Sequence, residues 1–323
     1  MSRKAVVFGG SGFIGGHLVA ALAERGYERI VSADLRPSAN RTAGVEYVTC
    51  DLREPVGRQI EGDFDEAYNL AAVHTTPGHA DHEYYDANVF GALHVTRFCE
   101  EHGVRSLVFT SSISVYGPSE EAKSEASLPA PVSAYGKSKL QAEGIHEMWQ
   151  HAAADRRLAV ARLAVIFGPR EGGNFTRLAR ALATNTFLYP GRKDTIKGCA
   201  YVGEVIRTFR FALERPERLY TYNVAYPEPY TLERICAAFH EVGGLPRPKG
   251  TLPTSVMKAG VLPFEVLSAI GIRNPICRAR VDKLVHSTYI VPGRLLADGY
   301  SFETDLDEAL RRWLAAEPRG RFE

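Results

Sequence analysis

The sequence predicts an α/β protein with a doubly wound parallel sheet and a smaller C-terminal α/β lobe. Short apolar runs alternate with helical stretches through the first half of the 323-residue chain, and a glycine-rich loop joins the first run to the first helix. Beyond about residue 168, proline and glycine interrupt the pattern repeatedly. Apolar runs between helices are typical of parallel strands covered on both faces, which supports the predicted sheet.

The alternation of apolar runs and helical stretches in the first half predicts the strands and helices in order. Strands are predicted at Lys4–Phe8, Arg29–Ala33, Glu46–Cys50, Ala67–Ala72, Arg105–Ser112 and Leu158–Ile166. Helices are predicted at Phe13–Arg25, Asp81–His102 and Ser133–His151. A sheet of this kind binds its ligand at the carboxyl ends of the strands, so functional residues are expected there.

The second half predicts shorter elements and longer loops. Helices are expected at Asn174–Asn185 and Gly203–Glu214, and strands at Phe187–Gly191 and Tyr220–Ala225. Residues 1–168, with about 199–226 returning to them, form the first predicted domain. Residues 169–198 and 227–315 form a lobe that we expect to shape a substrate pocket.

Composition excludes several classes of function. A net charge of +1 argues against binding to nucleic acid or to an anionic membrane surface, because both require a basic face. The apolar runs are too short to span a bilayer, and Met1 leads directly into the first strand without a signal peptide. Five cysteines lack paired spacing, which predicts reduced thiols and a cytoplasmic protein.

Gly9, Gly12 and Gly15 lie between the first strand and the first helix, in the spacing of a dinucleotide-binding loop of the Rossmann type. Gly10 gives a second register of the same motif. Asp34 ends the second strand, where a carboxylate bonds the adenosine ribose and favours NAD over NADP. Arg36 leaves NADP open, because an arginine can accept its additional phosphate. Asp51 is expected at the adenine edge or as a helix N-cap.

Tyr135 and Lys139 are four residues apart in a predicted helix, so their side chains share a face. An ammonium beside a phenol favours the phenolate, which brings the tyrosine toward use as a general base. The pair therefore indicates removal of a proton from an alcohol as a hydride leaves. The strand that ends at Ser112 delivers a hydroxyl to the same edge of the sheet.

These motifs, in this order, resemble those of extended short-chain dehydrogenases/reductases of the NAD-dependent epimerase/dehydratase family. The resemblance covers roughly the first two-thirds of the chain. Its pieces are Gly9–Gly15, Asn69–Ala72, Asn88 with Gly91, Ser111 to Gly117, Tyr135 with Lys139, Arg162 to Pro169, and Tyr201-Val202.

The resemblance implies a role for each matching residue. Tyr135 is expected to be the acid/base, Lys139 to hold the nicotinamide ribose, Ser112 to bond the reacting sugar oxygen, and Asn88 to support the helix. The expected contacts of the NAD cofactor are Gly9, Gly12, Phe13, Ile14, Gly15, Asp34, Asp51, Leu52, Leu70, Ala71, Ala72, Asn88, Ser111, Tyr135 and Lys139. The expected substrate contacts are His74, Ser112, Ser114, Tyr135, Asn174, Arg192, Lys197 and Arg280. For the basic residues, a solvated surface charge is an equal alternative.

Departures from the family pattern narrow the expected reaction. Ile113-Ser114 stands where dehydratases carry an acidic pair, which disfavours dehydration. Gly203-Glu204 replaces the usual acidic pair after Tyr201-Val202. The expected activity is epimerisation of a nucleotide sugar, at C4 of a UDP-hexose. The alternatives are a 4-keto-nucleotide-sugar reductase, another hydroxy-compound dehydrogenase, and a nucleotide sensor without turnover.

Two further expectations concern metal and assembly. His74, His79 and His82 lie close together, but no cysteine or suitably spaced carboxylate completes a ligand set, so no metal is expected. The helices Asp81–His102 and Ser133–His151 would pair with those of a second copy into a four-helix bundle, as the family commonly does. A homodimer is therefore expected.

Overall fold

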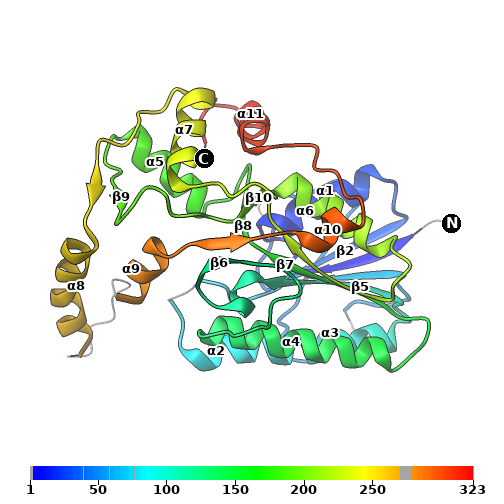
Figure 1. Ribbon diagram of the computed structural model, residues 1–323. Coiled ribbons are helices and arrows are strands. Elements are labelled where there is room, and N and C mark those ends of the chain that lie inside the picture. The colour runs from blue at the N-terminus through cyan, green and yellow to red at the C-terminus, as the bar shows by residue number, and fades with distance from the viewer. Residues whose placement is uncertain (1–2, 39, 58, 76–77, 270–277, 323) are drawn as a thin grey trace.

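The computed structural model describes residues 3–38, 40–57, 59–75, 78–269 and 278–322. Its main sheet has seven parallel strands in the order β11-β7-β5-β4-β1-β2-β3 (Figure 1). The strands are β1 (Lys4–Phe8), β2 (Arg29–Asp34), β3 (Glu46–Thr49), β4 (Glu66–Asn69), β5 (Ser106–Ser112), β7 (Arg157–Leu163) and β11 (Leu219–Val224). The winding reverses between β1 and β4, which creates the switch point where such sheets bind ligands. The predicted doubly wound parallel fold is confirmed.

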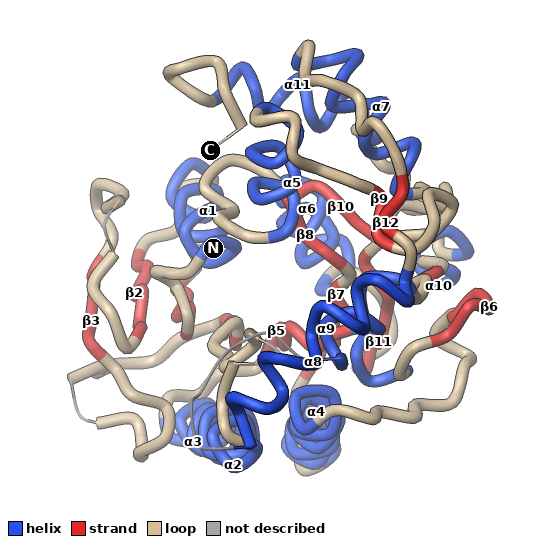
Figure 2. Tube along the Cα trace, turned by 90° about the vertical axis from the view of Figure 1, so that its left-hand side faces the viewer, coloured by secondary structure: helices blue, strands red, loops and turns tan. Residues whose placement is uncertain are grey.

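Helices cover both faces of this sheet, as Figures 1 and 2 show. One face carries α2 (Asp81–Tyr85), α3 (Gly91–Glu101) and α4 (Ala134–His151), and the other carries α1 (Phe13–Glu24) and α6 (Val202–Leu213). Because successive side chains of a strand point to opposite faces, neighbouring residues of β1 enter different cores. Val7 packs toward α1 and α6, whereas Phe8 packs against Phe98 of α3.

Several predicted elements have different limits in the structure. The helix predicted at Asp81–His102 is interrupted by a π-helical turn at Asp86–Phe90. The strand predicted at Leu158–Ile166 is broken at Ala164, after which β8 (Val165–Phe167) pairs with β10 (Cys199–Tyr201) outside the main sheet. The strand predicted at Ala67–Ala72 ends at Asn69.

The C-terminal part of the chain forms a third core beside the sheet. Its helices are α5 (Asn174–Ala183), α7 (Leu232–Gly243) and α11 (Leu306–Ala316). Phe167, Phe175, Phe239 and Trp313 are buried together there, and the rings of Phe167 and Phe175 stack at 4.3 Å. The strand predicted at Phe187–Gly191 is shorter in the structure. It is β9 (Tyr189–Pro190), which pairs with β12 (Thr251–Leu252).

Further elements of this part are α8 (Thr254–Ala269), α9 (Arg278–Val285), α10 (Gly293–Ala297) and β13 (Thr288–Ile290). Figure 2 shows α8 and α9 in front of the carboxyl ends of the main strands. α10 lies beside β11, where Arg294 bonds Glu217 just before that strand begins. β13 pairs with β6 (Ser119–Lys123), a strand that comes directly after the end of β5 and its 3-10 turn at Ile113–Tyr116. Throughout the described ranges, no helix has the length and apolarity that crossing a bilayer requires.

Glu204 fastens the C-terminal segment to α6. Its side chain is only 1% exposed, and its two oxygens accept hydrogen bonds from the backbone of Glu303 and Thr304, both at 2.8 Å, and from the hydroxyl of Tyr300 at 2.7 Å. Arg207 pairs with the same carboxylate at 2.8 Å. The single acid that remains after Tyr201-Val202 therefore holds the segment that precedes α11.

Candidate active site

The glycine loop follows β1 with very close packing of its backbone. Gly9 has a φ of +79°, which only glycine adopts at low cost, and its N–H donates to the carbonyl of Ala33 at 2.8 Å. A Cβ on Gly15 would lie 2.1 Å from the carbonyl oxygen of Gly9. The loop therefore brings bare backbone to the start of α1, where N–H groups and the helix dipole favour an anion.

Asp34 lies beside this loop at the end of β2. Its carboxylate accepts the N–H of Ser11 at 3.0 Å and that of Arg36 at 3.2 Å. Ser11 and Arg36 also line a small hollow that Arg41 and Tyr47 complete. The structure thus places this acid beside the glycine loop, and its role toward a ribose stays a prediction.

The other predicted residues at the adenine end have different surroundings. Asp51 accepts hydrogen bonds from the backbone and guanidinium of Arg53, which lower the pKa of its carboxyl against the opposing effect of burial. Leu52 is buried. Asp51 therefore closes a local turn and does not cap a helix.

Tyr135, in the first turn of α4, lies close to Ser112, the last residue of β5. Burial raises the pKa of Tyr135, and the nearby hydroxyl of Ser112 opposes this rise. The Ser112 hydroxyl also accepts the N–H of Ser114 at 3.2 Å, which caps the 3-10 turn after β5. The phenol and hydroxyl are thus adjacent, as removal of a proton from a substrate alcohol requires.

Lys139 lies one helical turn beyond Tyr135 and is 2% exposed. Its ammonium has no hydrogen-bond partner among the described residues, and it lies 4.6 Å from the centre of the Phe109 ring. Burial lowers the pKa of Lys139 to about 7, against the charge of Glu143, which raises it. A buried ammonium with unused donors is suited to hold the hydroxyl groups of a ribose.

Asn88 and Ser133 fix the position of α4. The hydroxyl of Ser133 accepts the N–H of Gly136 at 3.0 Å and so caps the helix. Asn88, in the π-helical turn, accepts the N–H of Val73 at 3.0 Å and donates to the hydroxyl of Ser138 at 2.9 Å. This amide therefore joins the loop after β4 to the turn of α4 that carries Tyr135 and Lys139.

A buried polar network that the sequence analysis did not identify lies behind these residues. Glu143 accepts hydrogen bonds from Ser111 and Arg162, and Arg162 donates to the hydroxyl of Tyr116 at 2.9 Å. That hydroxyl donates in turn to Asn223 at 2.8 Å. Lys139 and Glu143 are four residues apart, as Tyr135 and Lys139 are. This spacing is the signal in the sequence that indicates Glu143. The hydroxyl of Ser111 is used within this network.

The remaining predicted cofactor contacts lie along the same edge. Phe13 and Ile14 begin α1, and Leu70, Ala71 and Ala72 follow the end of β4; all five are half-buried. A Cβ on Gly9 would lie 2.6 Å from the backbone nitrogen of Ala71, so the two loops are in close contact. The structure therefore brings both loops together at the switch point.

The predicted substrate contacts divide between this edge and the lobe. The N–H of Ser114 donates to the hydroxyl of Ser112, and His74 is exposed after β4. Arg192 forms an ion pair with Glu120 and donates to Ser287 at 2.9 Å. The ammonium of Lys197 donates to the carbonyl of His286 at 2.8 Å.

Asn174 is exposed at the start of α5, where its side-chain oxygen accepts a bond from Arg177 at 2.8 Å. Arg280 belongs to α9, but its side chain lies outside the described residues. The described contact of Asn174 is therefore with its own helix and not with Tyr135.

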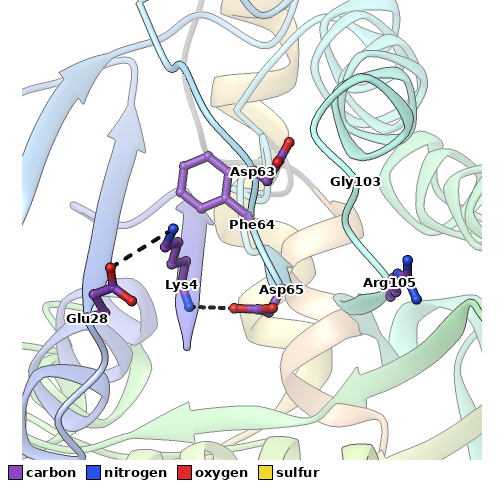
Figure 3. A pocket seen from close by; sticks show the side chains of 7 residues that line it. All are labelled: Lys4, Glu28, Asp63, Phe64, Asp65, Gly103 and Arg105. Atoms are coloured by element: carbon purple, nitrogen blue, oxygen red, sulfur yellow. Dashed lines mark hydrogen bonds and ion pairs between the residues drawn. The ribbon is translucent and has the colours of Figure 1, made fainter. Parts of the chain in front are cut away.

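A second hollow lies at the opposite edge of the sheet and takes no part in this site. Its volume is about 450 Å³, and it is lined by residues that precede or begin strands (Figure 3). Lys4 pairs there with Glu28 at 4.0 Å, and its N–H donates to Asp65 at 2.8 Å. In this fold class, ligands bind at the carboxyl ends of the strands and not at the amino ends. The charged groups of this hollow bond to one another, which agrees with that rule.

The histidine cluster does not form a ligand set in the part of the chain that the structure describes. No group of three histidine, cysteine or acidic side chains there is arranged to hold a metal ion. His79 instead bonds Glu83 at 2.8 Å on the first turn of α2. Cys50, Cys99, Cys199 and Cys236 are buried free thiols, and Cys277 lies outside the described residues.

Comparison with known proteins agrees with this arrangement. One relative is N-acetyl-alpha-D-glucosaminyl-diphospho-ditrans,octacis-undecaprenol 4-epimerase of Escherichia coli O157:H7, which is 28% identical over 323 residues, 98% of this chain and 96% of its own. UDP-glucose 4-epimerase of Streptococcus mutans serotype c is 29% identical over 179 residues, 52% of this chain and 54% of its own. The structure of MoeE5 in complex with UDP-glucuronic acid and NAD superposes with a TM-score of 0.72 at 25% identity, and covers 95% of this chain and 96% of that chain.

The model of the NAD dependent epimerase/dehydratase family matches residues 5–225, which include the glycine loop, Ser112, Tyr135 and Lys139. This confirms the predicted family and the predicted cofactor, NAD. The chain therefore belongs to the NAD dependent epimerase/dehydratase family.

Proposed function

We propose that the protein is an NAD-dependent sugar epimerase that acts at C4 of a diphosphate-linked hexose, with a UDP-hexose as the first candidate. The observation that carries this proposal is the constellation at the carboxyl edge: Tyr135 lies beside Ser112, and one turn away the ammonium of Lys139 is buried without a partner among the described residues. The two curated relatives described above are both named as 4-epimerases.

The residues at the carboxyl edge of the main sheet fit NAD. Gly9, Gly12 and Gly15 allow the loop backbone to pack closely at the start of α1, where a pyrophosphate would bind, and Asp34 is placed for the adenosine ribose. The buried ammonium of Lys139 has free donors for the second ribose. When bound, NAD supplies a reversible acceptor for the hydride of the sugar carbon.

Each catalytic side chain then has a defined task. Tyr135 takes the proton of the sugar hydroxyl at its Oη and later returns it. Ser112 bonds the same sugar oxygen, since a hydroxyl can donate or accept as that oxygen changes from alcohol to ketone. Lys139 favours the phenolate by its charge. Epimerisation requires that the keto-sugar present its other face before the hydride returns.

The lobe is proposed to recognise the rest of the substrate. Residues 169–198 and 227–315 form it in this proposal, while 1–168 and about 199–226 hold the cofactor. The proposed contacts of the substrate are His74, Ser114, Asn174, Arg192, Lys197 and Arg280. We also propose a cytoplasmic homodimer that forms through α3 and α4, where Leu93 and Met148 are 44% and 64% exposed and Phe90, just before α3, is 50% exposed.

The test begins with protein purified without added cofactor. Mass spectrometry of released small molecules is expected to detect NAD. Incubation with UDP-glucose or UDP-N-acetylglucosamine is expected to give the C4 epimer by NMR, with no net change in NADH. Stoichiometric consumption of NADH or NADPH would instead establish the alternative, a reductase of keto-sugars.

A second candidate differs only in the carrier of the sugar diphosphate. The relative from Escherichia coli, which this chain matches along nearly its whole length, is named for a substrate on undecaprenol. The 16 residues of α8 include only two charged ones, Lys258 and Glu265, and Figure 1 shows this helix beyond the carboxyl ends of the strands. Turnover of a hexosamine diphosphate on polyprenol, without turnover of the UDP sugar, would favour this carrier.

A further inference from the structure

A buried carboxylate lies one helical turn beyond Lys139. Glu143 is 2% exposed and shares the face of α4 that carries Lys139. Its Oε1 accepts the hydroxyl of Ser111 at 2.5 Å and Nε of Arg162 at 3.0 Å. Its Oε2 accepts a second bond from Arg162 at 2.7 Å. One side chain thus joins α4 to the ends of β5 and β7.

Glu143 is also the charge that acts on the buried ammonium. Burial lowers the pKa of Lys139, and Glu143 is the group that raises it. The other side of Lys139 is apolar, because the Phe109 ring lies 4.6 Å away. Among the described residues, the ionisable groups facing this region from the surrounding elements are Tyr135, Glu143, His146 and Glu147 on α4, Tyr84 on α2, Tyr116 after β5, and Arg162 on β7.

We propose that Glu143 is a positioning residue for this site, whose carboxylate keeps the ammonium of Lys139 charged and holds Ser111, and with it Ser112, in register with Tyr135. This inference rests on the function proposed above. Glu143 acts only through its neighbours: its charge favours the ammonium, the ammonium favours the phenolate, and its bond to Ser111 fixes the strand residue before the catalytic serine.

Arg162 allows the proposal to be tested by the direction in which the ionisation of Tyr135 shifts. Its guanidinium shares the carboxylate of Glu143, so loss of the Arg162 charge leaves the full negative charge of Glu143 to act on Lys139. Loss of the Glu143 charge has the opposite effect, because it leaves two cations without a counter-charge. The two substitutions are therefore expected to move the ionisation of Tyr135 in opposite directions, whereas a purely structural network would respond alike to both.

The experiment compares Glu143→Gln and Arg162→Gln with the parent protein, each loaded with NAD. The ionisation of Tyr135 is followed by tyrosinate absorbance, as the difference from the same protein carrying Tyr135→Phe. Glu143→Gln is expected to move this ionisation up by about one pH unit, since tenfold fewer molecules then carry the phenolate at a given pH. The kcat at neutral pH falls about tenfold and recovers at higher pH. Arg162→Gln is expected to move the ionisation down.

Unchanged ionisation in Glu143→Gln, or shifts in the same direction in both variants, would overturn the proposal. If either single variant fails to fold, Glu143→Gln with Arg162→Gln replaces the buried ion pair by two neutral amides that can hydrogen-bond to each other. The ionisation of Tyr135 should still move up in this double variant, because Lys139 has lost its near counter-charge; no shift overturns the proposal. If no sugar is epimerised, the proposed function fails, while the tyrosinate titration still decides the role of Glu143.

Discussion

At the scale of single residues, the site is defined by what burial does to ionisable groups. Burial raises the pKa of Tyr135 and lowers that of Lys139 to about 7. Burial is the larger cause of both shifts, and it favours the neutral phenol and the neutral amine. Ser112 opposes it for the phenol and Glu143 opposes it for the amine, and the net pKa values already include both effects.

Replacement of Tyr135 by phenylalanine tests the acid/base role. The ring keeps its place, 6.2 Å from that of Tyr84, so the fold and NAD binding should be preserved. The kcat should fall by roughly 10²- to 10⁴-fold, because no group remains to transfer the proton. Tyr27→Phe is the matched control, since that hydroxyl bonds Glu66 at the amino edge of the sheet. Equal activity of the two variants in the epimerase assay would refute the assignment.

Two adjacent glycines give a sharp test of the nucleotide loop. A Cβ on Gly15 would lie 2.1 Å from the Gly9 carbonyl, whereas one on Gly16 meets nothing within 4 Å. Gly15→Ala should lower stability by about 1–3 kcal/mol and weaken NAD binding at least tenfold. Gly16→Ala, inside α1, should raise stability by about 0.5–1 kcal/mol. Urea unfolding and titration with NAD check both, and similar behaviour of the two would contradict the close packing.

At the scale of elements, the sequence pattern predicted the strands and helices of the sheet but not where strands change partners. The apolar run Leu158–Ile166 contains no signal for its break, since Ala164 bonds Val224 while Val165 bonds Gly198 of another segment. β6 was missed because Ser119–Lys123 is a polar stretch, stabilised only by a strand far along the chain. Partners distant in sequence leave no local periodicity.

The same limit applies to the site. The i, i+4 spacing and the glycine motif place Tyr135, Lys139 and the loop, because both follow from local geometry. The network of Arg162, Tyr116 and Asn223 joins three strands or their ends through side chains, and no spacing along the chain encodes it. The sequence likewise could not predict that Arg192 pairs with Glu120, because this pair depends on the position of β6.

Glu204 links two elements, and its removal should release one of them. Glu204→Ala leaves Arg207 and several donors of the segment before α11 without their acceptor. Breaking such a buried pair is expected to lower stability by about 3–5 kcal/mol. Glu214→Ala removes an exposed partner of Arg210 on the same helix and should change stability by less than about 1 kcal/mol. Equal losses in urea unfolding would show that Glu204 is not a fastening point.

At the scale of the whole molecule, the site depends on contact between the sheet and the C-terminal part of the chain. Each has its own buried core, and the catalytic side chains lie at the carboxyl edge of the sheet. Figure 2 shows α8 and α9 in front of that edge. The charged pair of Arg192 and Glu120 and the ladder of β6 with β13 tie the two parts together.

Assembly is tested on the outer face of α3. Leu93→Arg places a cation on the proposed twofold interface and should convert the dimer to a monomer in light scattering after gel filtration. Leu188→Arg is the control, because Leu188 is similarly exposed, at 43% against 44%, but lies in the lobe. A dimer that persists in Leu93→Arg, or a monomer in the parent protein, would refute the proposed interface.

The ladder between β6 and β13 also has a consequence for how the protein is made. Glu120 of β6 bonds the backbone of Ser287, which lies 167 residues later. At translation rates of roughly 5–20 residues per second, the ribosome needs roughly 10–30 s to deliver that partner. All seven strands of the main sheet are made before Ser287, while the loop that leads from Ser112 still lacks its final support. A nascent chain would thus acquire its cofactor site first and its complete reaction centre only as synthesis ends.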